Sequence, residues 1–326
     1  MLAKWQCDIA NIRDLLPAIA GSFHKEKNMI HQEIPIFLKG SGPDAKLVVY
    51  IQNFETDMLV QERPLVLLCP GGGYNHLSVR EAESEALQFL AMGYHAAVLK
   101  YSVSPAMFPT QLCELAWAVK FLRSKAGEWH IVSDKIIVQG SSAGGHVAAS
   151  LGVFWNQDWL LETLKECGAG QATGNVGQVD GNADNATSHI LDTTEFTSED
   201  IKPNGMLLCY PVITSGEFAH KGSFEKLAGE DTKLWKMLSL EHQVTEDTPP
   251  AFLWHTFTDG SVPVENSLLF VSALRRVGVS TEFHMYPKGQ HGLALGSKLT
   301  ASADGKHMQK ECESWIHLAA TWLGQL

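Results

Sequence analysis

The stretch KIIVQGSSAGGHVAASL, residues 135–151, decides the fold of this chain. Its apolar start, IIVQ, predicts a strand, and the small residues that follow GSSAG (140–144) predict a helix. A serine on such a turn projects its hydroxyl from the sheet and has a strained backbone. Glycines are needed on both sides because a Cβ at Gly140 or Gly144 would clash with the neighbouring strand or helix. The pattern predicts Ser142 as a nucleophile, although a Ser/Gly-rich loop that only turns the chain would read the same way.

Upstream of this turn, strand-like and helix-like segments alternate. An antiparallel pair of edge strands is expected at 30–38 and 46–53, and a solidly apolar strand begins at Arg63 and ends in PGGGY (70–74). A continuous apolar strand is buried on both faces, which is typical of the centre of a mostly parallel sheet. Helix, strand and helix then follow over 81–129, which favours right-handed βαβ crossovers. We therefore predict an α/β fold with helices on both faces of the sheet.

Downstream, three further strands are predicted, over 204–213, within 248–267 up to His255 and Thr256, and at the start of 281–295. Helices are predicted at 264–278, closed by Gly278, and at about 305–324. The terminal helix is expected to bury one face, formed by Met308, Cys312, Trp315, Ile316 and Leu323. Residues 1–29 are predicted to form a helical lead-in.

Two insertions, 156–203 and 214–245, interrupt this alternation and are candidates for a cap over the site. Within the first, 168–189 is rich in Gly, Asn, Ala and Asp and has no periodic apolar face, so disorder stays an alternative there. The second is more helical. Packing onto the domain is favoured over lining a pocket mouth for four of its apolar residues, Phe224, Leu234, Trp235 and Leu238. With no internal repeat, residues 1–326 are predicted to form a single domain.

Composition excludes several classes of partner. The net charge is −11 and there is no run of Lys or Arg, which argues against nucleic acid and against an anionic membrane surface. Nowhere do about 18 apolar residues run together, so no membrane span is expected. The first residues lack a signal-peptide pattern, and a cytoplasmic location is therefore expected.

The cysteines are widely scattered and are expected to be reduced. Most of them lie in strand-like or helix-like apolar runs, where a thiol acts as a small buried hydrophobe. Neither C-x-x-C nor H-E-x-x-H occurs, so no metal site is expected. The six are Cys7, Cys69, Cys113, Cys167, Cys209 and Cys312.

The glycine triplet in PGGGY carries a second chemical prediction. Three glycines after a buried strand permit a backbone that turns two N–H groups toward one point, as half of an oxyanion hole would require. A flexible or phosphate-binding turn is the alternative. No Lys-Ser/Thr follows the glycines, as a P-loop needs, and the G-x-G-x-x-G spacing of a dinucleotide site is absent.

A serine nucleophile needs a base, and the base needs a group that fixes its tautomer. The chain offers Ser142, Asp259 and His291 in this order, each just past the end of a predicted strand. Because the carboxyl ends of parallel strands share one edge, these side chains are expected to meet there. His146 is a competing base but is expected to point toward the sheet, and His255 is expected within or at the end of a strand. Asp247 precedes its strand and would lie at the wrong edge.

On these motifs the chain resembles the α/β-hydrolase-fold serine esterases. In particular it is similar to the bacterial acetyl esterase and acetylxylan-esterase-like branch, related to hormone-sensitive-lipase-type enzymes. The resemblance covers about residues 60–296, through PGGGY, GSSAGGH, TPPAFLWHTFTDGSVPVENS and GQHGL. One departure is Pro70, which stands where lipase-type relatives carry a histidine, so any bond from that side chain is missing.

The resemblance implies a role for each site residue. Ser142 would be the nucleophile, His291 the general base and acid, and Asp259 the carboxylate that orients His291. The backbone amides of Gly72, Gly73 and Ala143 would form the oxyanion hole.

The activity that the resemblance implies is hydrolysis of short acyl esters, acetyl esters of sugars or xylo-oligosaccharides above all, with no cofactor and no metal. The partner would be a small-molecule or oligosaccharide ester, and a homo-oligomer stays open. A serine peptidase of the same fold is less favoured because no propeller-like repeat domain restricts access. A lipase would prefer long acyl chains. A non-catalytic binding protein of this fold is disfavoured because such proteins lose a member of the triad, and all three residues are present.

Overall fold

The computed structural model of the protein describes residues 29–55, 57–168 and 195–326. Nearly all of the predicted lead-in (1–29) and of the Gly/Asn-rich stretch (168–189) therefore lies outside the described residues. The predictions for those segments, and the prediction of a single domain over the whole chain, stay predictions.

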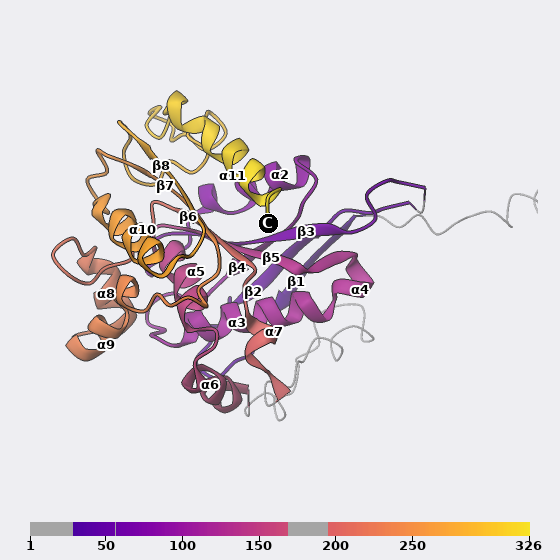
Figure 1. The fold of residues 1–326 in the computed structure, drawn as a ribbon, viewed down its shortest axis with the longest axis horizontal. Helices are drawn as coiled ribbons and strands as arrows, with labels where there is room; N and C mark the ends of the chain where they lie inside the picture. Colours follow the sequence, from indigo (N-terminus) through magenta and orange to yellow (C-terminus); the bar gives the residue numbers. More distant parts are fainter. Residues whose placement is uncertain (1–28, 56, 169–194) are drawn as a thin grey trace, which may run out of the picture.

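The described strands form one mixed sheet in the order β1-β2-β4-β3-β5-β6-β7-β8 (Figure 1). β1 and β2 pair antiparallel at one edge, and β2 also pairs antiparallel with β4, whereas every pairing from β4 to β8 is parallel. The prediction of an antiparallel edge on a mostly parallel sheet is confirmed. The strands are β1 (Ile30–Pro35), β2 (Lys46–Ile51), β3 (Arg63–Cys69), β4 (His95–Lys100), β5 (Ile131–Ser141), β6 (Gly205–Cys209), β7 (Ala251–Thr256) and β8 (Thr281–Tyr286).

The two strands that lead into the site lie side by side in the middle of the sheet. β3 is hydrogen-bonded to β4 on one side and to β5 on the other, as its continuous apolar sequence predicts. Its last five residues, from Leu65 to Cys69, are fully buried. The glycine triplet and the nucleophile turn therefore leave the sheet at adjacent positions.

Helices cover both faces of the sheet (Figure 1). α2 and α11 pack on one face, with Phe89 and Trp315 in that core, and α3, α5 and α10 pack on the other. The helices are η1 (Val79–Glu81), α2 (Glu83–Ala91), α3 (Thr110–Ser124), α4 (Ala126–Trp129), α5 (Ala143–Phe154), α6 (Asp158–Gly168), α7 (Ser198–Ile201), α8 (Lys221–Ala228), α9 (Thr232–Met237), η5 (Leu240–His242), α10 (Glu265–Val277), η6 (Lys310–Ser314) and α11 (Trp315–Leu323).

The C-terminal helix is shorter than predicted. A helix over 305–324 was expected, but α11 begins only at Trp315, after the short η6. Gly305 and His307 have φ values of +76° and +70°, which break a right-handed helix. Met308, expected on the buried face, is 48% exposed, whereas the other four residues predicted for that face are buried.

The first insertion contains more helix than predicted, and the second is helical, as predicted. α6 continues the helical structure directly after α5, at the point where the alternation was expected to stop. In the second insertion, α8 and α9 place Phe224 and Leu238 in the main core, which confirms the prediction that they pack onto the domain. Leu234 and Trp235 pack partly buried against the same core.

The described cysteines agree with the prediction of unpaired thiols. Cys69, Cys113, Cys209 and Cys312 are free and buried, and Cys167 is free and partly exposed. Within the described residues, each helix falls short of the length and apolarity that crossing a membrane requires.

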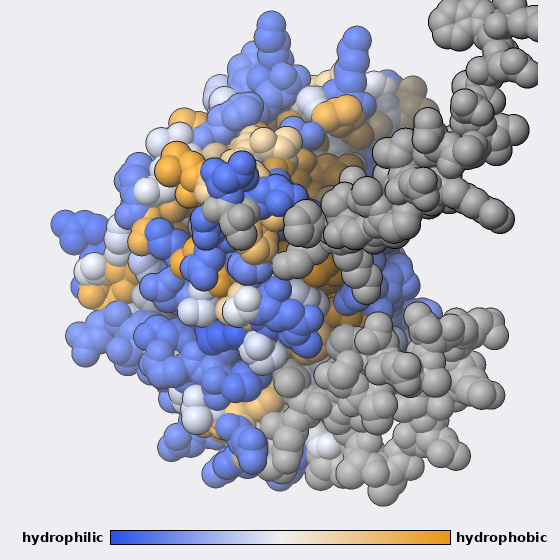
Figure 2. Space-filling view, turned by 90° about the vertical axis from the view of Figure 1, so that its right-hand side faces the viewer, coloured by the Kyte–Doolittle hydropathy of each residue, from blue (hydrophilic) through white to orange (hydrophobic). Residues whose placement is uncertain are grey.

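The surface mixes polar and apolar residues. Figure 2 shows hydrophilic residues spread over the described part of one face, with apolar residues between them. Apolar residues exposed by more than half include Phe37, Leu59, Val79, Phe257 and Leu299. Scattered exposure of this kind is usual at protein surfaces and does not by itself mark a docking face.

Candidate active site

Ser142 occupies a strained turn between β5 and α5. Its backbone lies at φ 54° and ψ −120°, a region that side-chain-bearing residues rarely adopt, and the residue is 7% exposed. Two bonds fix this conformation: Ser142 N–H donates to Cys209 O at 3.0 Å, and Val212 N–H donates to Ser142 O at 3.0 Å. The turn is thereby tied to the carboxyl end of β6.

The glycines around the serine are required by close backbone approach, as predicted. A Cβ at Gly140 would lie 2.2 Å from Gly144 O in the first turn of α5. A Cβ at Gly144 would lie 1.9 Å from Cys69 O at the end of β3. Both contacts are far inside van der Waals distance, so only glycine fits at either position.

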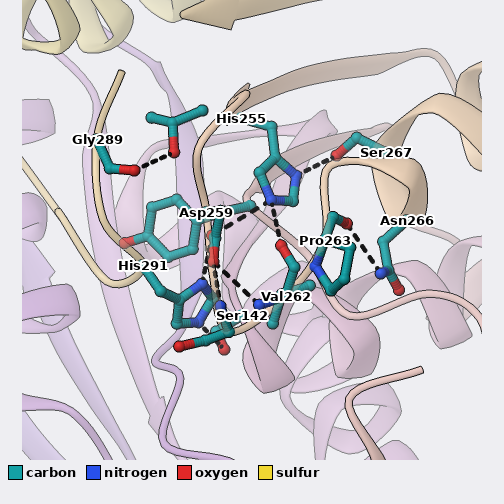
Figure 3. A network of polar contacts seen from close by, with 12 residues as sticks. Ser142, His255, Asp259, Val262, Pro263, Asn266, Ser267, Gly289 and His291 are labelled. Atoms are coloured by element: carbon teal, nitrogen blue, oxygen red, sulfur yellow. Dashed lines mark hydrogen bonds and ion pairs between the residues drawn. The ribbon is translucent and has the colours of Figure 1, made fainter. Parts of the chain in front are cut away.

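The structure brings Ser142, His291 and Asp259 together at the carboxyl edge of the sheet (Figure 3). Ser142 Oγ lies 2.7 Å from His291 Nε2, and His291 Nδ1 lies 2.6 Å from Asp259 Oδ2. Because a carboxylate only accepts, Nδ1 carries the proton, and the serine hydroxyl donates to Nε2. The arrangement has the geometry of a nucleophile, a base and an orienting acid.

Asp259 is held in a buried, fully paired position. Its Oδ1 accepts from Ser261 N–H at 2.9 Å and from Val262 N–H at 3.0 Å, and its side chain is 1% exposed. Burial raises the pKa of the Asp259 carboxyl, but the contacts with His255 and His291 outweigh this effect and hold the pKa well below its usual range. The carboxylate is therefore ionised at neutral pH.

His255 does not face Ser142 but lies on the other side of Asp259 (Figure 3). It is fully buried near the end of β7, as predicted from its position, and its Nε2 lies 3.3 Å from Asp259 Oδ2. Sequence reasoning weighed His255 only as a competing base and missed this contact. Its spacing of four residues from Asp259, across the end of a strand, is the signal that could have indicated it.

His146 lies elsewhere than predicted. It was expected to point at the sheet, but its Nδ1 lies 2.9 Å from Tyr74 Oη and its Nε2 lies 2.9 Å from Leu238 O. Every residue of α5 is buried. His146, one turn beyond Ser142, therefore packs between the glycine turn and the second insertion and not against the sheet. Burial lowers the pKa of His146 to about 4, so the imidazole is uncharged at neutral pH.

The glycine triplet uses one amide for structure and leaves two free. Gly71 N–H donates to Glu81 Oε2 at 2.9 Å. Among the described residues, the amides of Gly72, Gly73 and Ala143 donate to no protein acceptor. Gly72 has φ +130°, and a Cβ there would lie 2.0 Å from the carbonyl oxygen of His76. These three amides are therefore available to an oxyanion.

Two residues that sequence reasoning missed connect the glycine turn to the loop of His291. Glu81 Oε1 accepts from Tyr210 Oη at 2.6 Å, and Tyr210 Oη accepts from Ala294 N–H at 2.9 Å. The Tyr210 ring also meets the imidazole of His291 edge to face, with 5.1 Å between centroids. In the sequence, Glu81 resembles an ordinary acidic residue at a helix start, so nothing there indicates this role.

Pro70 takes part in this framework through its backbone. The Pro70 carbonyl accepts from the hydroxyl of Tyr101 at 2.6 Å, and both groups are buried. The position where lipase-type relatives carry a histidine is thus held by a backbone contact here.

The second insertion borders the glycine turn. His220 Cε1 and Ser223 Oγ each lie 3.9 Å from the position of a Cβ at Gly73, and His220 Nδ1 lies 2.8 Å from Ser223 Oγ. Burial lowers the pKa of His220, the charge of His291 lowers it further, and Asp259 opposes the shift. His220 is thus a half-buried imidazole within electrostatic range of the site. No cluster of three His, Cys, Asp or Glu side chains suited to a metal occurs in the described part of the chain.

Known proteins resemble this chain in both sequence and fold. The family described as BD-FAE matches residues 54–274. Endo-1,4-beta-xylanase B of Butyrivibrio fibrisolvens is 32% identical over 257 residues, which is 77% of this chain and 35% of that protein. The acetylxylan esterase of Xylanibacter ruminicola is 25% identical over 236 residues, which is 70% of this chain and 40% of that protein. The chain thus spans well under half the length of these two relatives.

Two solved structures share most of the fold. The acetyl ester-xyloside bifunctional hydrolase from Caldicellulosiruptor lactoaceticus has a TM-score of 0.67 and 33% identity, covering 87% of this chain and 89% of that one. The carboxylesterase Cest-2923 from Lactobacillus plantarum WCFS1 has a TM-score of 0.71 and 25% identity, covering 91% and 97%. The chain has the α/β-hydrolase fold and belongs to the BD-FAE family.

Proposed function

We propose that this chain is a serine carboxylic ester hydrolase that acts on short acyl esters, in particular acetyl esters of sugars or xylo-oligosaccharides. The observation that carries the proposal is the unbroken line of contacts from Ser142 Oγ through His291 to Asp259, at 2.7 and 2.6 Å. The names of the relatives, an acetylxylan esterase and an acetyl ester-xyloside hydrolase among them, support the substrate class.

In the first half of the reaction, Ser142 Oγ attacks the ester carbonyl carbon while its proton moves to His291 Nε2. Nδ1 of the same ring keeps its own proton bonded to Asp259, whose negative charge stabilises the imidazolium that forms. A buried, ionised carboxylate suits this role because it does not take the proton itself. The alcohol then leaves with the proton from Nε2.

The negative oxygen of the tetrahedral intermediate needs donors that are already in place. The amides of Gly72, Gly73 and Ala143 are free among the described residues and flank Ser142 from the ends of β3 and β5. One such donor is commonly worth about 10² to 10³ in kcat. The bond from Gly71 to Glu81 supports Gly72 and Gly73 as the glycine donors, because it removes the first amide from the set.

In the second half, water attacks the acyl-serine by the reverse use of the same groups. His291 takes a proton from the water and returns it to Ser142 Oγ as the ester bond breaks. The products are a carboxylic acid, acetate for an acetyl ester, and the free enzyme. Apart from the ester and water, the groups that act in this cycle are side chains and amides of the chain.

The activity is tested with p-nitrophenyl acetate and longer homologues. We expect hydrolysis of the acetate by the wild type and a loss of at least about 10³ in kcat for Ser142→Ala. Ser141→Ala is the matched control, because its hydroxyl is buried next to the proposed nucleophile and accepts from Gln139. Equal rates for wild type and Ser142→Ala would refute the proposal, and faster turnover of long-chain esters than of acetate would favour a lipase.

The substrate class needs its own test. Acetylated xylo-oligosaccharides are incubated with the wild type and with Ser142→Ala, and released acetate is measured. We expect serine-dependent release. If p-nitrophenyl acetate is hydrolysed but no acetate is released from the oligosaccharides, the esterase reaction stands and the sugar-ester assignment is wrong.

A further inference from the structure

We propose that His255 is a positioning residue of the site. It holds the Asp259 carboxylate against His291 by a hydrogen bond to Asp259 Oδ2, the oxygen that His291 also contacts. The inference deepens the proposed serine esterase function and rests on it. It starts from the finding that Asp259 Oδ2 is approached by two imidazoles, His291 at 2.6 Å and His255 at 3.3 Å (Figure 3).

The position of the proton on His255 follows from its neighbours. Its Nε2 lies 3.0 Å from the carbonyl oxygen of Val262, and a carbonyl can only accept. Nε2 therefore carries a hydrogen that is bonded to Val262 O, and Asp259 Oδ2 lies 3.3 Å from the same nitrogen, within reach of that hydrogen. Its Nδ1 lies 2.8 Å from Ser267 Oγ and forms a second hydrogen bond there.

His255 lies within the sheet, whereas Asp259 lies beyond the end of its strand. His255 is fully buried within β7, pairs in register with Met285 of β8, and is held by Ser267 from α10. Asp259 lies beyond the strand, in the turn that leads to α10. The amides of Ser261 and Val262 hold its Oδ1, but they belong to the same turn. The contact with His255 links the carboxylate oxygen directly to a strand of the sheet.

Sharing one oxygen between two donors has a predictable effect on His291. A hydrogen bond from His255 partly neutralises the negative charge on Asp259 Oδ2. The carboxylate therefore stabilises a protonated His291 less than it would without this bond. Without the bond from His255, the protonated form of His291 would be more stable. The loss of kcat/KM on acidification would then set in at a higher pH. In the described residues, the titratable groups that face His291 are Asp259, His220 and Tyr210, and the one that faces His255 is Asp259.

The test is the pH profile of His255→Leu with p-nitrophenyl acetate. We expect kcat to fall about tenfold with KM nearly unchanged, as the loss of one bond to a charged group predicts. The pH at which kcat/KM falls to half on acidification should rise by about half a pH unit or more. His255→Gln, whose amide nitrogen reaches the place of Nε2, should recover most of both changes.

Two controls separate positioning from a purely structural role. His284→Leu removes another histidine–carboxylate pair, with Glu282 at 2.7 Å, from the neighbouring strand β8, and should leave the profile unchanged. A His255→Leu enzyme that melts earlier but keeps the wild-type kcat and the wild-type fall of kcat/KM on acidification would overturn the proposal. A wild type that lacks serine-dependent hydrolysis would instead refute the underlying esterase function.

A measurement on the wild type covers the case in which His255→Leu does not fold. With ¹⁵N-labelled histidine, NMR at pH 7 reports which nitrogen of each ring carries the proton, and the His255 signals are assigned by their absence in His255→Gln. The proposal requires a protonated Nε2 on His255. A proton on Nδ1 alone would overturn it, because Nε2 could not then donate to Asp259.

Discussion

Glu81 Oε2 accepts the amide hydrogen of Gly71 at 2.9 Å, so a carboxylate ten residues downstream determines which amides of the glycine triplet remain free. The other oxygen of Glu81 accepts from Tyr210, which in turn holds Ala294 in the loop of His291. One buried side chain thus fixes the glycine turn and the loop of His291 relative to each other.

Replacing Glu81 should therefore slow turnover. In Glu81→Gln only one oxygen remains to accept from two donors, and we expect kcat with p-nitrophenyl acetate to fall about tenfold or more while KM changes little. Glu83→Gln is the control, since Glu83 is a partly exposed partner of Lys100 at 3.0 Å. A kcat for Glu81→Gln equal to that of the wild type would contradict the role of Glu81.

The glycine turn itself should be intolerant of a methyl group. Gly72→Ala places a Cβ 2.0 Å from the carbonyl of His76 at φ +130°, so the turn must move, and we expect kcat to fall by about 10² or more. Gly127→Ala is the matched change in α4, where no atom lies within 4 Å of the new Cβ. It should keep full activity and unfold at the same or a higher temperature. Normal turnover by Gly72→Ala would exclude Gly72 as an oxyanion donor.

The depressed pKa of Asp259 predicts how stability depends on pH. The folded-state pKa lies below the unfolded value of about 3.9, so the carboxylate contributes stability that is fully present above that value. This contribution is lost as pH falls through the folded pKa. The difference in melting temperature between the wild type and Asp259→Asn should therefore be fully present at pH 5 to 6 and shrink progressively as pH falls below about 4. A difference in melting temperature that grows as the pH falls would contradict this prediction.

Replacing His220 should impair the hydrolysis of sugar esters more than that of aryl esters. Its Nδ1 is bonded to Ser223, and its Nε2 has no partner among the described residues, so it can bond a hydroxyl on the alcohol half of the substrate. For His220→Ala we expect KM for acetylated xylo-oligosaccharides to rise about three- to tenfold, and kcat/KM for p-nitrophenyl acetate to stay within about twofold. His242→Ala, an exposed histidine of the same insertion, is the control. Equal effects on both substrates would argue against contact with the sugar.

The residues of the candidate site that could be predicted from sequence are those that lie just after the end of a strand. Ser142, Asp259 and His291 each follow a predicted strand that is a strand in the structure, and a parallel sheet brings such ends to one edge. The glycines of the elbow were predictable for a similar reason, because close packing of a strand against a helix leaves no space for a Cβ.

The supporting contacts could not be predicted because they depend on side-chain orientation over long separations. Glu81 and Tyr210 are 129 residues apart and meet only once β3 and β6 flank β5. The direction of His146 depends on an insertion 92 residues away, which supplies Leu238 O. The late start of the C-terminal helix comes from two residues with positive φ, which hydrophobic periodicity does not report.

The backbone of Ser142 implies a trade-off between stability and function. The strain at φ 54° depends on having a Cβ and not on the hydroxyl, so Ser142→Ala keeps it, whereas Ser142→Gly relieves it. Thermal unfolding should therefore show the glycine variant to be more stable than the alanine variant, although neither has a nucleophile. We also expect the protein itself to be less stable than its glycine variant, a cost in stability that the proposed reactivity of Ser142 would explain.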